Sequence, residues 1–163
     1  MELKRHLDLR YVFVGLYVLF VVVYVVIGLQ PADAIDYEIS ADLEIPAIGL
    51  ESGVTKLTLQ DGRLNTPDTI VGSFSRAEHT TLLIGHSTTV FRHLDSVRVS
   101  DEIKYDYESY YVTNIEVEPK AGISMSKLLK DSSADTLVLM TCAGELLDNG
   151  DATHRLIITA VKY

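Results

Sequence analysis

The chain has 163 residues, of which 47% are hydrophobic and 23% are charged, a balance typical of one globular domain with an appendage. The formal net charge is −9 and no block of Lys or Arg occurs, which argues against a nucleic-acid partner because binding to phosphates requires a cationic surface. The single cysteine excludes an intrachain disulfide and every multi-cysteine zinc or iron–sulfur site.

The N-terminal region contains an apolar segment, residues 11–29, without one charged or strongly polar side chain. At about 1.5 Å per residue, a helix of this length nearly matches the hydrocarbon thickness of a bilayer. A buried helix of a soluble core is the alternative, but such a helix normally has a polar face, and this segment is apolar all round. We therefore predict a single transmembrane helix over residues 11–29.

The charges on the two sides of this segment differ, being basic before it at Lys4, Arg5 and Arg10 and acidic after it at Asp33, Asp36 and Glu38. By the positive-inside rule, residues 1–10 are then cytoplasmic and the remainder of the chain is outside. A cleaved signal peptide is the alternative, because Ala32-Asp33-Ala34 has the form of a cleavage site, but the apolar run exceeds the ~7–15 residues of a signal peptide. We predict a single-pass protein of the cell membrane, with a linker at 30–42 and an extracellular domain at 43–163.

The predicted extracellular domain is a series of short runs rich in β-branched and aromatic residues, separated by turn-forming residues. Eight strands are predicted, at about 43–50, 56–59, 69–74, 81–86, 102–107, 110–118, 136–142 and 155–163. Two short helices are predicted at 89–97 and 124–130, and a tight hairpin connection at Glu108-Ser109. Because closure hides the edges of this many strands, we expect a mainly β fold, a closed eight-stranded barrel with one or two short helices.

Cys142 ends the apolar run at 137–141 and precedes Ala143-Gly144, which places it at a strand end where the chain turns out of the sheet. A free cysteine is often a small buried hydrophobe, and that remains one explanation. In an oxidising compartment, however, a lone thiol is either buried or used. Cys142 is therefore a candidate nucleophile, which needs a partner that favours the thiolate or moves protons.

Histidine is the usual partner of a catalytic thiol, and the chain has five. Four of them have less specific explanations, as a cytoplasmic residue, as surface residues or as a residue preceding the last strand: His6, His79, His93 and His154. His86 closes the run TTLLIGH, where Gly85 permits close approach of the backbone, so its placement mirrors that of Cys142. A strand-end histidine satisfied by a backbone carbonyl is the alternative explanation for His86.

Arg155 opens the last apolar run of the chain. Its guanidinium could stabilise a thiolate, bind a substrate carbonyl or support a developing oxyanion. A salt bridge to one of the many carboxylates is the alternative explanation. It is harder to explain all three residues together, Cys142, His86 and Arg155, without a catalytic role.

Five segments of this chain resemble, in order, the sortases, the membrane-anchored cysteine transpeptidases of Gram-positive bacteria. The segments are LEIPAIGL (43–50), RLNTPDTIVGSFS (63–75), LLIGHSTTVFRHLDSV (82–97), LVLMTCAG (137–144) and HRLIITAVKY (154–163). The resemblance implies that Cys142 is the nucleophile, that His86 is the general acid/base, and that Arg155 positions the substrate and stabilises the tetrahedral intermediate.

Three neighbours of these residues are candidate substrate-binding residues, namely Thr141, Ser87 and Ala143. The sequence departs from the family at Val138, where the usual Thr-Leu-x-Thr-Cys motif begins with threonine, and at Ser87, which is often asparagine. The linker is too short for the N-terminal lid of pilin-polymerising members.

The resemblance implies that the enzyme cleaves an LPxTG-like C-terminal sorting signal of an exported protein after Thr. The acyl group then passes to an amine of a cell-wall precursor or a pilin, and no cofactor or metal is needed. Some sortases bind calcium, but a solvated acidic surface explains Glu78, Glu116 and Glu118 as well.

Three other functions are alternatives to transpeptidation. One is a membrane-anchored cysteine peptidase or hydrolase with water as the acceptor, and another is a non-catalytic, tethered β-barrel that binds an exported ligand. A peptidoglycan L,D-transpeptidase is a third thiol enzyme, but its Ser-x-Gly-Cys-type motif is absent.

Overall fold

The computed structural model describes residues 16–19, 37–148 and 151–163. The chain divides into two compact units, Met1–Asp36 and Tyr37–Tyr163. Residues 16–19 are helical, and within the described ranges no helix is both long enough and apolar enough to cross a membrane. The helix predicted over 11–29 lies mostly outside the described residues, as do all of the predicted N-terminal segment at 1–10 and the first part of the predicted linker.

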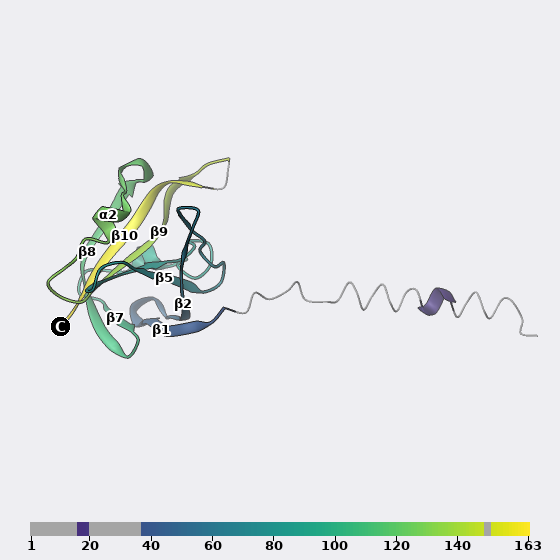
Figure 1. The fold of residues 1–163 in the computed structure, drawn as a ribbon, viewed down its shortest axis with the longest axis horizontal. Helices are drawn as coiled ribbons and strands as arrows, with labels where there is room; N and C mark the ends of the chain where they lie inside the picture. The colour runs from purple at the N-terminus through teal and green to yellow at the C-terminus, as the bar shows by residue number, and fades with distance from the viewer. Residues whose placement is uncertain (1–15, 20–36, 149–150) are drawn as a thin grey trace, which may run out of the picture. The chain divides into compact units, whose positions relative to one another are not determined.

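Eight strands of the second unit close into a barrel (Figure 1). They are β1 (Ile39–Ile45), β2 (Leu50–Lys56), β5 (Val71–Ser75), β6 (Thr80–Ile84), β7 (Glu102–Tyr105), β8 (Glu108–Pro119), β9 (Thr136–Leu146) and β10 (Ala152–Lys162). Around the barrel the order is β1-β2-β5-β6-β9-β10-β8-β7. The pairs β2–β5 and β6–β9 are parallel, and the other neighbours are antiparallel. The predicted closed eight-stranded, mainly β barrel is confirmed.

Short elements connect the strands. They are η1 (Pro46–Ile48), the two-stranded sheet of β3 (Leu59–Gln60) and β4 (Arg63–Leu64), η2 (Leu94–Ser96), η3 (Lys120–Gly122) and α2 (Met125–Leu128). The helix predicted at 124–130 is the single turn α2, whose N-cap Ser124 accepts a hydrogen bond from Lys127 N. The helix predicted at 89–97 was wrong in type, because that segment consists of turns and the 3-10 helix η2.

The predicted limits of the first two strands were wrong. The run 43–50 is divided between β1 and β2, because Pro46 opens η1 and Gly49 adopts a left-handed conformation at φ +63°. The predicted strand 56–59 does not form, since Lys56 ends β2 and Leu59 begins β3.

The β7–β8 turn lies two residues before the predicted position. Its central residues are Asp106 and Tyr107, with φ of 49° and 67°, and Tyr105 pairs with Glu108. Positive φ at both central residues is the geometry of a type I′ turn, which Asn-Gly normally supplies. The prediction was wrong here because Asp-Tyr carries no such signature.

Strand β9 is buried on both faces. Leu137 and Leu139 belong to the cluster inside the barrel, whereas Val138 packs outside it against α2, with Met140 at the margin of that second cluster. Because side chains alternate along a strand, a strand buried on both faces appears as a continuous apolar run. The same alternation directs the side chain of Cys142, two residues after Met140, to the outer face.

Gly85, which follows β6, leaves no room for a side chain. A Cβ at this position would lie 2.6 Å from Val90 Cγ1 and 2.7 Å from Phe91 Cδ2. Phe91 is only 1% exposed and cannot move aside without disturbing the core. The glycine therefore allows the segment after β6 to pack directly on the barrel.

We predict that Gly85→Ala lowers the free energy of unfolding by about 1–3 kcal/mol, because overpacking forces neighbouring side chains to shift. Urea denaturation followed by tyrosine fluorescence would measure the change. Gly122→Ala is the matched control, since nothing lies within 4 Å of its Cβ, and it should change stability by less than about 0.5 kcal/mol. Equal effects of the two substitutions would contradict the packing argument.

His79 joins the start of β6 to the segment before β9. Its Nδ1 lies 2.9 Å from Asp135 Oδ1, and its backbone N–H donates to Asp131 Oδ1 at 3.2 Å. The hydrogen bond with Asp135 raises the pKa of His79 above 6.5 and lowers the pKa of Asp135 below 3.8. The histidine stabilises the fold below pH 6.5 and loses this effect as pH rises through its folded-state pKa, while the carboxylate loses its effect as pH falls below 3.8.

We predict that His79→Gln destabilises the protein most between about pH 4 and 6.5, and progressively less at higher pH. Urea denaturation of both proteins at pH 5.5 and 8.5 would measure this difference. His93→Gln is the control, because His93 forms no ion pair within the described residues. A penalty for His79→Gln that is the same at both pH values would refute the prediction.

Candidate active site

Strand register brings Cys142, His86 and Arg155 together. Arg155 in β10 is the cross-strand partner of Cys142 in β9. On the other side of β9, Ile84 of β6 pairs with Met140 in parallel. Two residues further along both strands, His86 therefore lies level with Cys142. Three residues from separate segments of the sequence thus meet at one end of the β6–β9–β10 sheet.

Two hydrogen bonds hold the backbone before His86 against β9. The buried Thr141 hydroxyl donates to the Gly85 carbonyl at 2.7 Å, and Gly85 N donates to the Met140 carbonyl at 3.3 Å. Thr141 is 4% exposed. These bonds fix the position along β9 at which the chain that carries His86 leaves the sheet, beside Cys142.

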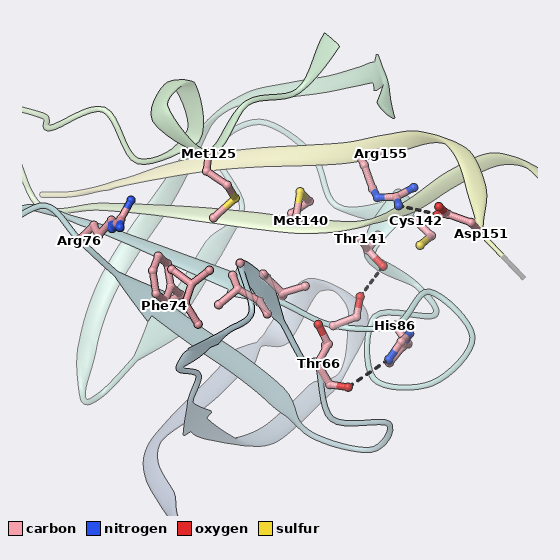
Figure 2. A pocket seen from close by; sticks show the side chains of 15 residues that line it. Thr66, Phe74, Arg76, His86, Met125, Met140, Thr141, Cys142, Asp151 and Arg155 are labelled. Carbon is pink, nitrogen blue, oxygen red and sulfur yellow. Dashed lines mark hydrogen bonds and ion pairs between the residues drawn. The ribbon is translucent and has the colours of Figure 1, made fainter. Parts of the chain in front are cut away.

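A cavity of about 570 Å³ extends from these residues along the outer face of the sheet. Figure 2 shows Cys142 between Arg155 and His86 at one end, with Phe74 and Arg76 at the far end. Apolar side chains form much of the wall between the two ends: Leu59, Leu64, Phe74, Ile84, Met125 and Met140. The cavity thus combines an apolar wall with a thiol, an imidazole and a guanidinium at one end, which suits a ligand with both apolar and polar parts.

His86 is only loosely held. Its Nε2 lies 3.4 Å from the Thr66 carbonyl and 3.6 Å from Asp68 Oδ1, and its side chain is 42% exposed. Both distances exceed those of a strong hydrogen bond. The backbone-carbonyl contact weighed for this histidine is present, but it leaves the ring accessible from the cavity.

Arg155 is held much more firmly. Its side chain is 14% exposed, and its Nη2 donates to Asp151 Oδ1 at 2.7 Å. Its Nη1 donates to the carbonyls of Ala152 at 3.0 Å and His154 at 2.9 Å. The salt bridge weighed as an alternative for this arginine therefore exists, in a side chain that also lines the cavity.

Asp151 is a carboxylate at any physiological pH. Its Oδ2 accepts from Lys120 Nζ, and its Oδ1 accepts from Arg155 and from the Ala152 N–H. The Lys120 hydrogen bond, with smaller contributions from Arg155 and Ala152, holds the pKa of Asp151 well below its ordinary value.

Cys142 is partly exposed and forms no disulfide, and it lines the cavity together with Thr141. Thr141 contributes its hydroxyl to the Gly85 carbonyl, whereas Ser87 and Ala143 do not line the cavity. Substrate binding by these three residues stays a prediction.

Several cavity residues were not identified from the sequence. Asp151 lies in a loop-like stretch beside Asn149-Gly150, which is typical of a turn. In a strand, side chains four residues apart are not neighbours, so no periodicity linked Asp151 to Arg155. Thr66 and Asp68 reach His86 only through the fold of the segment between β4 and β5.

The described residues include no group of three or more His, Cys, Asp or Glu side chains that could hold a metal ion. Glu116 accepts a hydrogen bond from Asn114 at 2.8 Å, and Glu118 pairs with Lys127. Both carboxylates therefore have polar partners of their own.

A family model for the sortase domain matches residues 43–163. Sortase A from Corynebacterium diphtheriae, as a lid mutant, superposes with a TM-score of 0.61 at 23% identity, covering 80% of this chain and 73% of that one. Sortase C-1 from Actinomyces oris gives 0.59 at 23% identity, covering 82% of both chains. A sortase D5 transpeptidase from Clostridium perfringens gives 0.59 at 21% identity, covering 78% of this chain and 82% of that one. No protein of curated function matches the sequence.

We predict that Thr141→Val lowers the free energy of unfolding by about 1–3 kcal/mol, because it leaves the Gly85 carbonyl without a buried donor. Thr141→Ser is the matched control, since it keeps the hydroxyl, and it should retain most of the stability. Thermal or urea denaturation would measure both variants. If valine is tolerated as well as serine, the hydroxyl does not hold the two strands.

Proposed function

Because this chain belongs to the sortase family, we propose that it is a cysteine transpeptidase that cleaves an LPxTG-like C-terminal sorting signal after the threonine. The observation that carries the proposal is the convergence of Cys142, His86 and Arg155 at one end of an apolar cavity. The half-exposed imidazole of His86 and the partly buried guanidinium of Arg155 lie on opposite sides of the thiol. This arrangement supports nucleophilic catalysis on a bound peptide.

The first half-reaction forms an acyl-enzyme. The Cys142 thiolate attacks the carbonyl carbon of the threonine, and the carbonyl oxygen becomes a tetrahedral oxyanion that Arg155 stabilises. The C–N bond to the glycine then breaks, and the imidazolium of His86 protonates the departing amine. The products are a thioester on Cys142, a released glycine peptide and a neutral His86.

The second half-reaction transfers the acyl group. An amine of the acceptor attacks the thioester, and His86 takes the proton that the amine loses. The second oxyanion collapses, the C–S bond breaks, and Cys142 leaves as a thiolate. The sequence of steps exchanges one amide for another and returns both side chains to their starting protonation states.

The cavity supports a peptide substrate more than a small molecule. Its apolar wall, formed in part by Phe74, Met125 and Met140, suits the leucine and proline side chains of the signal. The acyl portion must stay bound through both half-reactions, so we assign this wall to the residues before the scissile bond. The acceptor then approaches from the exposed side of His86.

We also propose that residues 11–29 anchor the enzyme in the cell membrane with residues 1–10 in the cytoplasm and the barrel outside. The apolar segment and its flanking charges support this arrangement. The substrates would be exported proteins with a sorting signal, and the acceptor a cell-wall precursor or pilin amine. Confinement to one membrane surface would raise their effective concentrations.

We predict that the full-length chain in detergent micelles forms a thioacyl adduct with an LPxTG-type peptide, visible by intact-protein mass spectrometry. Cys142→Ala should abolish the adduct, and His86→Ala and Arg155→Ala should slow its formation at least ~100-fold. His93→Ala is the matched control for His86→Ala and should retain the rate. Added triglycine should release the adduct as a new amide.

Other outcomes distinguish the other functions. Release of the adduct as free acid, at a rate that amines do not change, would identify a peptidase or hydrolase. Absence of an adduct with every peptide, together with a Cys142 that resists alkylation in the folded protein, would overturn the proposal in favour of a non-catalytic binding barrel.

A further inference from the structure

We propose that Asp151 is a positioning residue for the proposed reaction, which fixes the Arg155 guanidinium so that its remaining donors face the carbonyl attacked by Cys142. This inference rests on the proposed function. It extends the set of functional residues to a carboxylate that no sequence motif singled out.

The contact geometry of Asp151 supports this role. Its Oδ1 accepts from Arg155 Nη2 at 2.7 Å and from the Ala152 N–H at 2.8 Å, and its Oδ2 accepts from Lys120 Nζ. Lys120 opens η3, directly after β8, whose Pro119 pairs with His154 of β10. Three contacts therefore fix the carboxylate: the neighbouring N–H of Ala152, the guanidinium of Arg155 in β10, and the ammonium of Lys120 in η3.

The contacts of Arg155 leave some N–H donors of its guanidinium available. The guanidinium has five N–H groups. Both on Nη1 are used by the carbonyls of Ala152 and His154, and one on Nη2 is used by Asp151. Within the described residues, the Nε–H and the second Nη2–H have no hydrogen-bond acceptor.

Those two donors are the ones that a substrate oxygen could use. Arg155 is directly across from Cys142 in the strand register and lines the same cavity, and Figure 2 shows its guanidinium beside Asp151, with the thiol below both. An oxyanion is stabilised best by donors that are already oriented before the charge develops. Asp151 supplies this orientation, because a charged acceptor fixes one edge of the planar guanidinium and thereby the direction of the other donors.

The main test uses steady-state transpeptidation by the full-length chain in micelles, with an LPxTG peptide and triglycine. Asp151→Asn keeps the size of the side chain but removes its charge, and we expect kcat to fall about tenfold or more with KM within ~2-fold, because only transition-state stabilisation is lost. Asp151→Glu should recover part of kcat. Asp135→Asn is the matched control, since Asp135 pairs with His79 and Lys162 and not with Arg155, and it should stay within ~3-fold of wild type.

A double-mutant cycle separates positioning from a structural role. In an Arg155→Ala background, adding Asp151→Asn should change the rate of acyl-enzyme formation less than ~2-fold. The inference is overturned if Asp151→Asn has the same effect in both backgrounds, if it leaves kcat unchanged, or if Asp135→Asn is as damaging.

A measurement without substrate keeps this inference distinct from the proposed function. In ¹⁵N NMR spectra of the full-length chain, hindered rotation should give separate Nη signals for Arg155 in wild type, and the rotation that exchanges these signals should be faster in Asp151→Asn. An unchanged exchange rate in Asp151→Asn would overturn the inference. If wild type forms no acyl-enzyme with any peptide, the proposed function fails, whatever the NMR spectra show.

Discussion

The parallel pairing of β6 with β9 is the constraint on which the candidate site depends. It joins residues 56 positions apart, Thr80 with Thr136 and Ile84 with Met140. This register sets the position along β9 at which His86 leaves the sheet, beside Cys142. A shift of one residue would turn the side chains of one strand to the other face. Two features oppose such a shift: the Thr141 hydrogen bond to Gly85, and the opposite burial of Leu139 inside the barrel and Val138 outside it.

The features that the sequence predicted well are those with a strong local pattern. The apolar run before Cys142 and the TTLLIGH run before His86 showed two buried strand ends, and the strand count led to a closed barrel. The details that failed depend on longer-range structure. Asp106 and Tyr107 adopt positive φ without the usual turn residues, and Asp151 reaches Arg155 across the register irregularity between Ala152 and His154 at the start of β10.

The charges around the thiol are distributed unevenly. On one side lies a guanidinium with three acceptors of its own, of which only Asp151 is charged. On the other side lies an imidazole with long contacts to Thr66 and Asp68. A proton carrier must reorient between two partners during a cycle, whereas an electrostatic stabiliser works best when it is immobile. The difference in restraint between His86 and Arg155 fits the different tasks that we assign to them.

The connectivity of the barrel also bears on how the protein folds. Two strand pairs are parallel, and the one between β6 and β9 closes a loop of more than fifty residues. Pairings between residues so distant in sequence raise the contact order, because loop entropy is lost before the strands gain their contacts. The β9–β10 hairpin, by contrast, is local and places Cys142 beside Arg155 early. We therefore expect His86 to join the site only when the barrel closes, so that a partly folded chain holds the thiol and the arginine without the histidine.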